Sequence, residues 1–369
     1  MWNKLVLVLM VAVIGWSAGD RSALADARTP EAPASPWAAA SEAYLLSPPK
    51  GTGPVVVRAS FLLQNINQID DAAETFEFRG VMKLTWQDPR RAFDPAVEKV
   101  DEKIYQGTFQ FNEIFPAWFP QLVLVNESGL FEKQGVILRV RPDGTMILVE
   151  TVNARAKAYF DLRRYPFDRQ HLYAVFEVLG ADSEEVVLEA EPTSAAPADY
   201  EVRVPEWTVE RINTLTKNRE AHYAGHQGTT SSYVVSMDVE RDSFFAVRLV
   251  VLPLMLIVML SWSVFWMERS SLADRISVSF IGILTAVAYQ LVVTDIQPDI
   301  SYMTLMHGFL NLSFFIMCAT VLVNLRVGTL DRAGETAAGD RVDRRCRWLF
   351  PLVYFGLIAV MTAVTFTAF

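Results

Sequence analysis

Apolar and polar residues alternate along the first two thirds of the chain, in short segments separated by Gly, Pro, Asp or Asn. These segments include VVVRASFLLQNI, TFEFRGVMKLTW, GVILRVRP, TMILVETVNARA, LYAVFEVL and EEVVLEA. Because alternate side chains of a β-strand point to opposite faces of its sheet, each segment has one apolar face to bury. The pattern predicts an antiparallel, immunoglobulin-like β-sandwich of about ten strands over residues 55–243.

Four long apolar segments without this alternation follow in the last third of the chain. They cover residues 244–267, 276–293, 302–325 and 348–369. These lengths suit a hydrocarbon core about 30 Å thick. They predict an all-α transmembrane domain of four helices, with the first three in residues 244–325 and the fourth in residues 348–369.

The charges between these segments predict their orientation. Residues 326–347 contain six arginines, whereas the turn between the second and third segments carries Asp295 and Asp299 and no basic residue. Loops rich in Arg and Lys stay on the cytoplasmic side of a membrane. Residues 326–347 are therefore predicted to form a cytoplasmic loop, with the sandwich and the last residue outside.

The amino-terminal 25 residues have the three parts of a secretory signal peptide: Lys4, the apolar run 5–16, and the small-residue site Ala23-Leu24-Ala25. An uncleaved anchor is the alternative, but this run is short for spanning a bilayer. Residues 26–54 are rich in Ala, Pro and Ser and lack periodicity, which predicts a flexible lead-in to the sandwich.

Composition excludes several classes of protein. A net charge of −9 argues against binding to nucleic acid, which requires an excess of Lys and Arg. Cys318 and Cys346 both lie in the helical part, so the exported part cannot contain a disulfide. The sequence has no His-Glu-x-x-His and no phosphate loop, so we expect neither an enzyme nor a required cofactor.

Several motifs occur in a specific order along the chain. They are LTWQDP with Trp86 and Asp88, AWFPQLVLVN, the turn Tyr165-Pro166-Phe167-Asp168, Arg241 before the first apolar segment, and Pro253 within it. In this order they resemble the pentameric ligand-gated ion channels, the Cys-loop receptor superfamily, over residues 55–369. The stretches SWSVFWMERSS, SYMTL and RRCRWLFPL resemble the bacterial branch.

This resemblance implies a homopentamer in a bacterial inner membrane, surrounded by lipids, with its amino-terminal domain periplasmic. It further implies that a small-molecule agonist binds between ectodomains and opens a pore for monovalent cations. A non-conducting, membrane-anchored sensor or assembly module in the periplasm is the alternative function.

Animal relatives bracket the Tyr-Pro-Phe-Asp turn with two cysteines, and the matching positions here are Ala158 and Leu172. The turn therefore lacks a disulfide, as in bacterial members. We expect packing to hold it, since Pro166 fixes φ and Phe167 offers an aromatic anchor to the tops of the helices.

The resemblance makes the second apolar segment the pore lining. Steps of three and four residues along one helical face give Ser277, Ile281, Leu284, Ala288, Leu291 and finally Asp295. An apolar ring closes a pore by excluding water, and Leu284 occupies the position of the gate leucine. From the segment alone, a stripe that faces lipid is an equal alternative.

Asp274 falls where cation-conducting relatives carry an acidic ring, and the Pro-Ala-Arg insertion of anion-conducting relatives is missing. Five carboxylates at a constriction favour cations. The next residue, Arg275, is rotated by about 100° on a helix, so we expect it to face the cytoplasm or a neighbouring subunit. The alternative is that the two charges form a helix-start pair at the subunit interface.

The family pattern also implies a coupling interface between the two domains. Its members here are Asp70, Asp71, Pro166, Phe167, Asp168, Arg241 and Pro298. A buried arginine needs a carboxylate partner, so we predict that Asp71 pairs with Arg241. A purely structural salt bridge would give the same pattern.

The agonist site departs from the family pattern. Amine-binding relatives use an aromatic cage, but the matching positions here hold Val81, Val125 and Leu179. Tyr223 and Tyr233 are left as candidates to cap the subunit interface, whereas Trp86 and Trp118 are expected in the core. An amine ligand is therefore not predicted.

Modulation by protons or divalent cations stays open. His222 and His226 titrate near neutral pH in principle, but solvated loop histidines are the favoured interpretation. His307 lies in the third apolar segment, where an ionisable residue is a functional candidate, and a neutral histidine bonded to a neighbouring helix explains it equally well. Carboxylate oxygens could bind calcium, although most acidic turns are only solvated. The candidate calcium ligands are Asp70, Asp71, Asp182, Glu184 and Glu185.

Overall fold

A computed structural model describes residues 47–107, 115, 117–191, 203–220, 228–267, 272–294 and 302–368. The predicted signal peptide and most of the lead-in lie outside the described residues. So do several predicted functional residues, namely His222, Tyr223, His226, Asp295 and Pro298.

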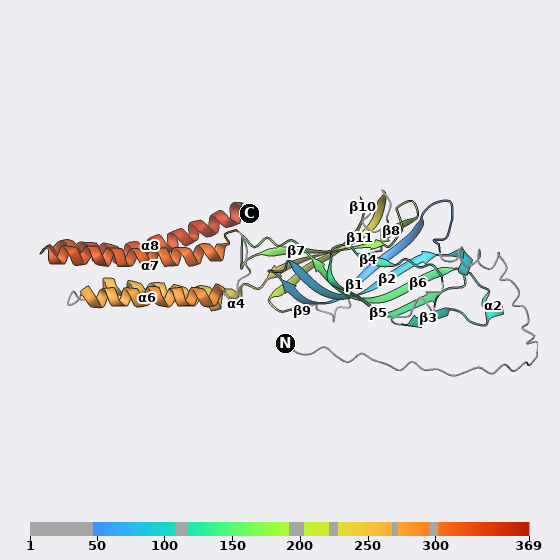
Figure 1. The fold of residues 1–369 in the computed structure, drawn as a ribbon, viewed down its shortest axis with the longest axis horizontal. Helices are drawn as coiled ribbons and strands as arrows, with labels where there is room; N and C mark the ends of the chain where they lie inside the picture. The colour runs from blue at the N-terminus through green and yellow to red at the C-terminus, as the bar shows by residue number, and fades with distance from the viewer. Residues whose placement is uncertain are drawn as a thin grey trace, which may run out of the picture. The chain divides into compact units, whose positions relative to one another are not determined.

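The described residues before Phe244 form two β-sheets (Figure 1). The first sheet has the order β3-β5-β6-β2-β1-β8 and the second has the order β4-β7-β11-β10-β9. All neighbouring strands run antiparallel except β1 and β8, which run parallel. The strands are β1 (Val55–Asp70), β2 (Thr75–Gln87), β3 (Lys103–Gly107), β4 (Leu122–Leu124), β5 (Glu127–Val140), β6 (Thr145–Lys157), β7 (Arg169–Val178), β8 (Val186–Ala190), β9 (Arg203–Val204), β10 (Trp207–Glu220) and β11 (Thr229–Arg241). The predicted β-sandwich is confirmed, and its first strand begins at Val55 as expected.

The alternation of the sequence places aromatic rings between the sheets. Phe61 of β1 and Phe78 of β2 meet Phe176 of β7, with ring centroids 6.0 and 6.5 Å from that of Phe176. All three side chains are fully buried. Trp86 packs edge-on against Trp118 at 6.1 Å, so the expectation that both tryptophans serve the core is confirmed.

Two short helices interrupt the chain between β2 and β3. They are η1 (Pro89–Arg91) and α2 (Pro95–Glu98), and an aspartate caps the first turn of each. Pro at the first helical position suits both, because its missing N–H has no partner there in any case.

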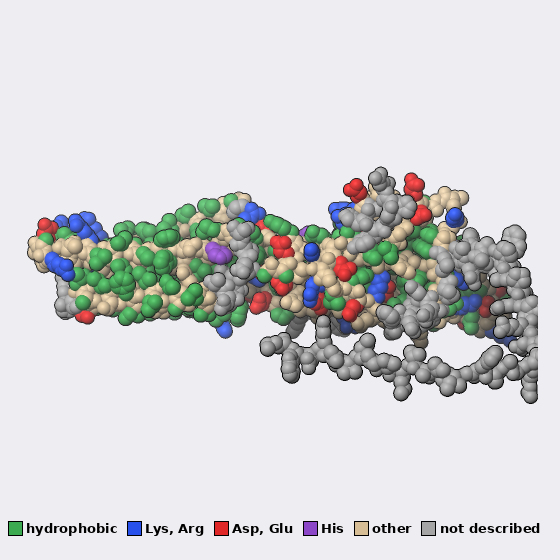
Figure 2. Space-filling model, viewed as in Figure 1, with side chains coloured by type: hydrophobic (Ala, Val, Ile, Leu, Met, Phe, Trp, Pro, Cys, Tyr) green, Lys and Arg blue, Asp and Glu red, His purple; other side chains and the backbone are tan. Residues whose placement is uncertain are grey.

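Four helices among the described residues are long and apolar enough to span a membrane. The first span combines α4 (Phe244–Ala246), the π-helical turn η2 (Val247–Val251), α5 (Leu252–Ser261) and η3 (Trp262–Phe265). The others are α6 (Leu272–Thr294), α7 (Leu305–Arg332) and α8 (Thr336–Ala368), which run side by side (Figure 1). Figure 2 shows hydrophobic side chains over these helices, with Lys and Arg side chains gathered at one end.

Residues 326–347 are mostly helical, whereas the sequence predicted a loop. Helix α7 continues to Arg332 and α8 begins at Thr336. Gly334, with φ +81°, ends α7 in a Schellman motif. Its N–H donates to the Asp331 carbonyl at 3.1 Å, and the Glu335 N–H donates to the Leu330 carbonyl at 3.0 Å. The arginines of this stretch therefore lie on α7 and α8, which continue beyond the apolar segments.

The first span is irregular next to Pro253. Proline has no N–H, so the carbonyl four residues earlier, that of Leu249, loses its helical partner. The Tyr289 hydroxyl of α6 donates to this carbonyl. A π-helical turn at Val247–Val251 accommodates the interrupted hydrogen-bond pattern before the proline. The Tyr289 bond also joins α6 to the first span.

Candidate functional site: the domain junction and the α6 face

Arg241, the last residue of β11, is held by two carboxylates. Its Nε donates to Asp168 Oδ1 at 2.8 Å, and its Nη2 donates to Asp71 Oδ2 at 2.5 Å and to Asp168 Oδ2 at 3.3 Å. The side chains of Arg241, Asp71 and Asp168 are 7%, 14% and 1% exposed. The expected pairing of Asp71 with Arg241 is present, and Asp168 is a second partner.

Two aromatic rings enclose the same guanidinium. Trp207 lies opposite Arg241 in the register of β10 and β11, and its ring centroid is 4.1 Å from Arg241 Cζ. The Tyr165 centroid is 4.9 Å away. A cation over an aromatic face is favourable, and more so when water is excluded. The site therefore combines charge pairing with stacking, for which the planar guanidinium is suited.

Burial and charge compete at Asp71. Burial raises the pKa of the Asp71 carboxyl above its ordinary value of 3.8, although attraction and a hydrogen bond from Arg241 oppose the shift. Burial also disfavours the charged form of Arg241, but the two carboxylates outweigh it and the pKa of Arg241 is raised. Within the described part of the chain, Asp71 Oδ1 has no hydrogen-bond partner. Asp71 is thus the weaker of the two partners.

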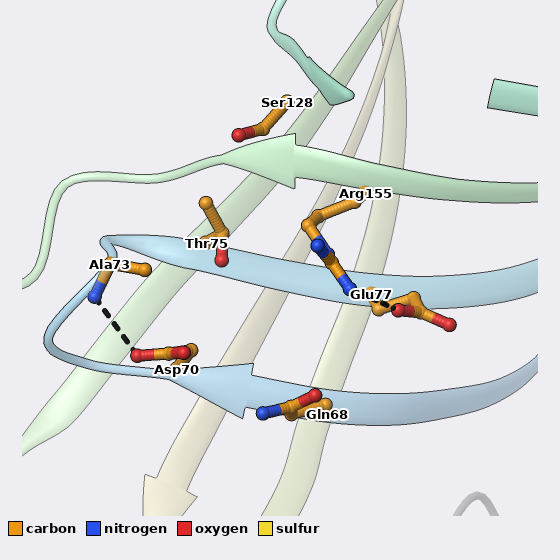
Figure 3. Close-up of a pocket in the computed structure, with 7 residues that line it drawn as sticks. All are labelled: Gln68, Asp70, Ala73, Thr75, Glu77, Ser128 and Arg155. Atoms are coloured by element: carbon orange, nitrogen blue, oxygen red, sulfur yellow. Dashed lines mark hydrogen bonds and ion pairs between the residues drawn. The ribbon is translucent and has the colours of Figure 1, made fainter. Parts of the chain in front are cut away.

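The neighbouring carboxylate of Asp70 belongs to a different environment. Its Oδ1 accepts from the Ala73 N–H at 2.9 Å and closes the β1–β2 turn. It lines a surface cavity of about 230 Å³ in which Arg155 Nη2 pairs with Glu77 Oε2 at 3.0 Å (Figure 3). Of the two adjacent aspartates at the β1–β2 turn, Asp71 bonds to Arg241 and Asp70 bonds within its own turn.

A glutamine holds the turn that has no disulfide. Gln170 Nε2 donates to the Asp161 carbonyl at 2.9 Å and to Asp168 Oδ2 at 2.6 Å, and its Oε1 accepts from the Asp161 N–H at 3.0 Å. Ala158 and Leu172, at the cysteine positions of animal relatives, are 3% and 0% exposed. Buried apolar contacts and this amide clamp replace the covalent link.

The same loop contacts the helices through residues that the sequence analysis missed. The Leu305 N–H at the start of α7 donates to the Arg163 carbonyl at 3.0 Å. The Tyr302 hydroxyl accepts from the Leu162 N–H at 3.0 Å and donates to the Phe160 carbonyl at 3.3 Å. The sequence placed Tyr302 at the start of an apolar segment and in the motif SYMTL, but predicted no contact for it. The available signal was its hydroxyl, since a buried Tyr O–H usually finds a hydrogen-bond partner.

Phe167 and Arg164 meet the end of α8. The Phe167 ring centroid is 6.3 Å from that of Phe366, so the predicted aromatic anchor contacts a helix. Arg164 Nη2 donates to the Phe366 carbonyl at 3.4 Å and lies over the same ring. The Tyr-Pro-Phe-Asp turn thus contacts α8 on one side and Arg241 on the other.

The predicted pore residues of α6 share one exposed face. Ile281, Leu284 and Leu291 are 64%, 71% and 68% exposed, and Ala286 and Val293 on the opposite face are buried. The remaining members of this face are also exposed: Asp274, Ser277 and Ala288. The apolar stripe expected from the sequence is therefore a free surface of the subunit.

Arg275 does not follow its prediction. It faces neither the cytoplasm nor a neighbouring subunit, because its side chain is 3% exposed and pairs with Asp343 of α8 in the same chain. The Nη1–Oδ2 and Nη2–Oδ1 distances are 2.9 and 2.8 Å. The prediction was wrong because local helix geometry cannot reveal a partner 68 positions away.

The predicted agonist positions do not form one surface within the chain. Val81 lies on β2 of the first sheet, whereas Val125 and Leu179 flank the paired strands β4 and β7 of the second. The prediction that Tyr233 caps the subunit interface is wrong, because its side chain is 0% exposed. It faces the core because it lies opposite Phe176 in the register of β11 and β7.

No group of three or more His, Cys, Asp or Glu side chains that could hold a metal ion occurs among the described residues. Asp182 Oδ1 accepts from the N–H groups of Glu184 and Glu185, at 2.9 and 3.0 Å, and so stabilises a turn. His307 Nδ1 lies 2.7 Å from the Thr304 hydroxyl that caps α7. His307 thus has a structural partner, and calcium binding stays a hypothesis.

Comparison with known proteins gives a family match. The profile described as "Neurotransmitter-gated ion-channel ligand binding domain" matches residues 43–243. A protein named "Proton-gated ion channel" from Gloeobacter violaceus is 26% identical over 322 residues, which are 87% of this chain and 86% of that protein.

Vertebrate receptor subunits are similar over much of the chain as well. The human "Gamma-aminobutyric acid receptor subunit rho-2" is 23% identical over 84% of this chain, and the beta-4 subunit from Gallus gallus is 25% identical over 70% of it. The chain spans only 64% and 51% of the length of these two relatives.

The two carboxylates at Arg241 are predicted to respond differently to pH. The folded-state pKa of Asp71 lies above its unfolded value, so its contribution to stability is fully present below about 3.8 and is lost as the pH rises through the raised pKa. Asparagine cannot ionise and keeps an oxygen for Arg241. The melting temperature of Asp71→Asn relative to wild type should therefore increase from about pH 4 to about pH 8, measured by intrinsic fluorescence in detergent.

Asp168→Asn is the matched variant. Asp168 is more deeply buried and accepts bonds from both Arg241 and Gln170, so its loss should destabilise the protein by about 2–4 kcal/mol at neutral pH. A difference between Asp71→Asn and wild type that does not change with pH would contradict the assignment.

Proposed function

The chain belongs to the pentameric ligand-gated ion channel family, and we propose that five copies of it form a cation-selective channel lined by α6. Membership makes the protein a multi-pass membrane channel with an extracellular ligand-binding domain. The proposal adds the homopentamer, the selectivity for monovalent cations, and the residues that carry out selection and gating.

The observation that carries this proposal is the opposite placement of two adjacent charges. Asp274 is exposed in the first turn of α6, whereas Arg275 is buried and paired with Asp343. If the exposed face of α6 lines the axis, the inner mouth presents the five Asp274 carboxylates, while the guanidinium of Arg275 is turned away from the axis. A ring of carboxylates attracts cations and repels anions.

The gate is assigned to the apolar middle of the same face. Leu284 is the most exposed of its large side chains, at 71%. Five such side chains around a narrow axis would leave water without hydrogen-bond partners, so the pore would dry and close. The non-conducting sensor gives no reason for this ordered face, with an acid at one end and apolar residues after it.

Protons are the agonist class that the junction supports best. Asp71 is a buried carboxylate with a raised pKa, and it bonds to the arginine that ends β11, three residues before the first span begins at Phe244. Taking up a proton would remove one of the two charges that hold Arg241. The name of the Gloeobacter relative agrees with this proposal, and the absence of rings at Val81, Val125 and Leu179 argues against an amine.

Asp274→Asn should weaken cation selectivity, because it removes five negative charges from one constriction. We expect the ratio of K⁺ to Cl⁻ permeability to fall by about tenfold or more. The measurement is the reversal potential across a KCl gradient, with the purified protein in liposomes. Glu335→Gln, which neutralises an exposed acid in the turn after α7, is the control and should match wild type. An unchanged ratio in Asp274→Asn would place selectivity elsewhere.

Leu284→Ser should raise leak current and lower the agonist requirement. Five hydroxyls in the apolar ring give water hydrogen-bond partners, so wetting the closed pore costs less free energy. Leu284→Ala is the matched variant, because it widens the ring but keeps it apolar. Serine currents indistinguishable from wild type would show that this face meets lipid, and the assignments of Ile281, Ala288 and Leu291 would fall with it.

Opening should increase as the outside is acidified, and Asp71→Asn should raise the open probability at neutral pH. Asparagine imitates the protonated carboxyl, which is neutral at every pH. The measurement is single-channel recording at a series of outside pH values from about 7.5 down to about 4.5, because the pKa of the Asp71 carboxyl is raised. A wild-type channel that ignores pH over this range would exclude protons as the agonist.

A further inference from the structure

A buried polar cluster joins the inner end of α6 to α7 and α8. It consists of Arg275 and Ser279 of α6, Asn324 of α7 and Asp343 of α8. Besides the two bonds to Asp343, Arg275 Nη2 donates to Asn324 Oδ1 at 3.0 Å. Asn324 Nδ2 donates to Ser279 Oγ at 2.8 Å, and Ser279 Oγ donates to the Arg275 carbonyl at 3.0 Å. All four residues are at most 5% exposed.

Asp343 supplies the carboxylate that neutralises the buried guanidinium of Arg275. Arginine does not lose its proton inside proteins, so Arg275 stays charged wherever it lies. A buried ion pair that loses one partner leaves an uncompensated charge at high cost in free energy. Without Asp343, the guanidinium would be driven towards water, and its neighbour Asp274 lies at an exposed position.

We propose that Asp343 is a specificity-determining residue, which keeps the pore cation-selective by cancelling the charge of Arg275. This inference rests on the proposed function, because it requires Asp274 at the inner mouth. Consecutive residues of a helix are separated by a rise of only 1.5 Å. An uncompensated charge at Arg275 would therefore lie close enough to an ion beside Asp274 to act on it, since the Debye length is about 10 Å at about 0.1 M salt.

The arrangement gives α8 a role beyond anchoring. Asp343 lies on the last helix of the chain, yet its carboxylate forms both of its bonds with a residue of α6. Each subunit then contributes one negative charge at Asp274, while the charges of Arg275 and Asp343 cancel each other. Position 343 acts on the permeating ion through Arg275, so it is a positioning residue and does not line the pore.

The test compares charge variants by their reversal potentials in a KCl gradient. Asp343→Asn keeps the shape of the side chain but frees five positive charges, so the ratio of K⁺ to Cl⁻ permeability should fall by about tenfold. Replacing the pair together, with Arg275→Met and Asp343→Leu, should restore the wild-type ratio because Asp274 is intact. Asp340→Asn, at an exposed position of the same helix, should match wild type.

The outcomes separate this inference from the proposed function. A cation-selective wild type whose ratio is unchanged in conducting Asp343→Asn channels would overturn only the role of Asp343. An equal loss in Asp343→Asn and in the double variant would overturn it too, since distorted packing would then be the cause. A wild type that favours anions would remove both proposals.

Failure of Asp343→Asn to assemble would not end the test. Pentamers that contain one or two variant subunits, isolated through a second affinity tag, keep most of the buried pairs. Their permeability ratio should fall in steps as variant subunits are added. A ratio that stays at the wild-type value in these mixed pentamers would contradict the inference.

Discussion

The buried guanidinium of Arg241 is the interaction on which the end of the sandwich next to the first span depends. A buried arginine cannot become neutral, so the chain must bring carboxylates to it. Asp71 comes from the β1–β2 turn and Asp168 from the turn before β7, while Tyr165 and Trp207 enclose the planar group. One side chain thereby fixes the positions of several separate segments at the residue that leads into the membrane.

The loop before β7 connects this arrangement to the helices without a disulfide. Gln170 clamps its two ends, and the backbone of the same loop bonds to Tyr302 and Leu305 at the start of α7. The Ala158 N–H donates to the Glu74 carbonyl at 2.9 Å, so the loop is also tied to the β1–β2 turn. Directional hydrogen bonds therefore connect the surroundings of Arg241 to the first turn of α7.

The hydrophobic pattern of the sequence was sufficient to predict the sandwich and the four spans, because period-two alternation and long apolar runs are local properties. It failed where the controlling contact is distant or the local signal is weak. Tyr233 lies in TTSSYVVS, where small polar residues are buried on both sides of it, so alternation does not reveal its face. The high charge of residues 326–347 predicts a loop, although the ends of α7 and α8 are helical there. Gly334 is the sequence signal for the tight connection between them.

The site residues divide in the same way. A face of α6 follows from helical spacing, and its members Ile281, Leu284 and Leu291 share one exposed surface. The direction of Arg275 does not follow from spacing, because the partner that draws it inward lies on α8. Arg275 and Arg241 are alike in this respect, because each buried guanidinium is paired with a carboxylate that is distant in the sequence. At the junction the two acids compete for one arginine and one has a raised pKa, so the charge balance there can change with protonation. At the other end of the chain's helices, Arg275 of α6 and Asp343 of α8 form a bidentate pair, which suits a fixed distribution of charge.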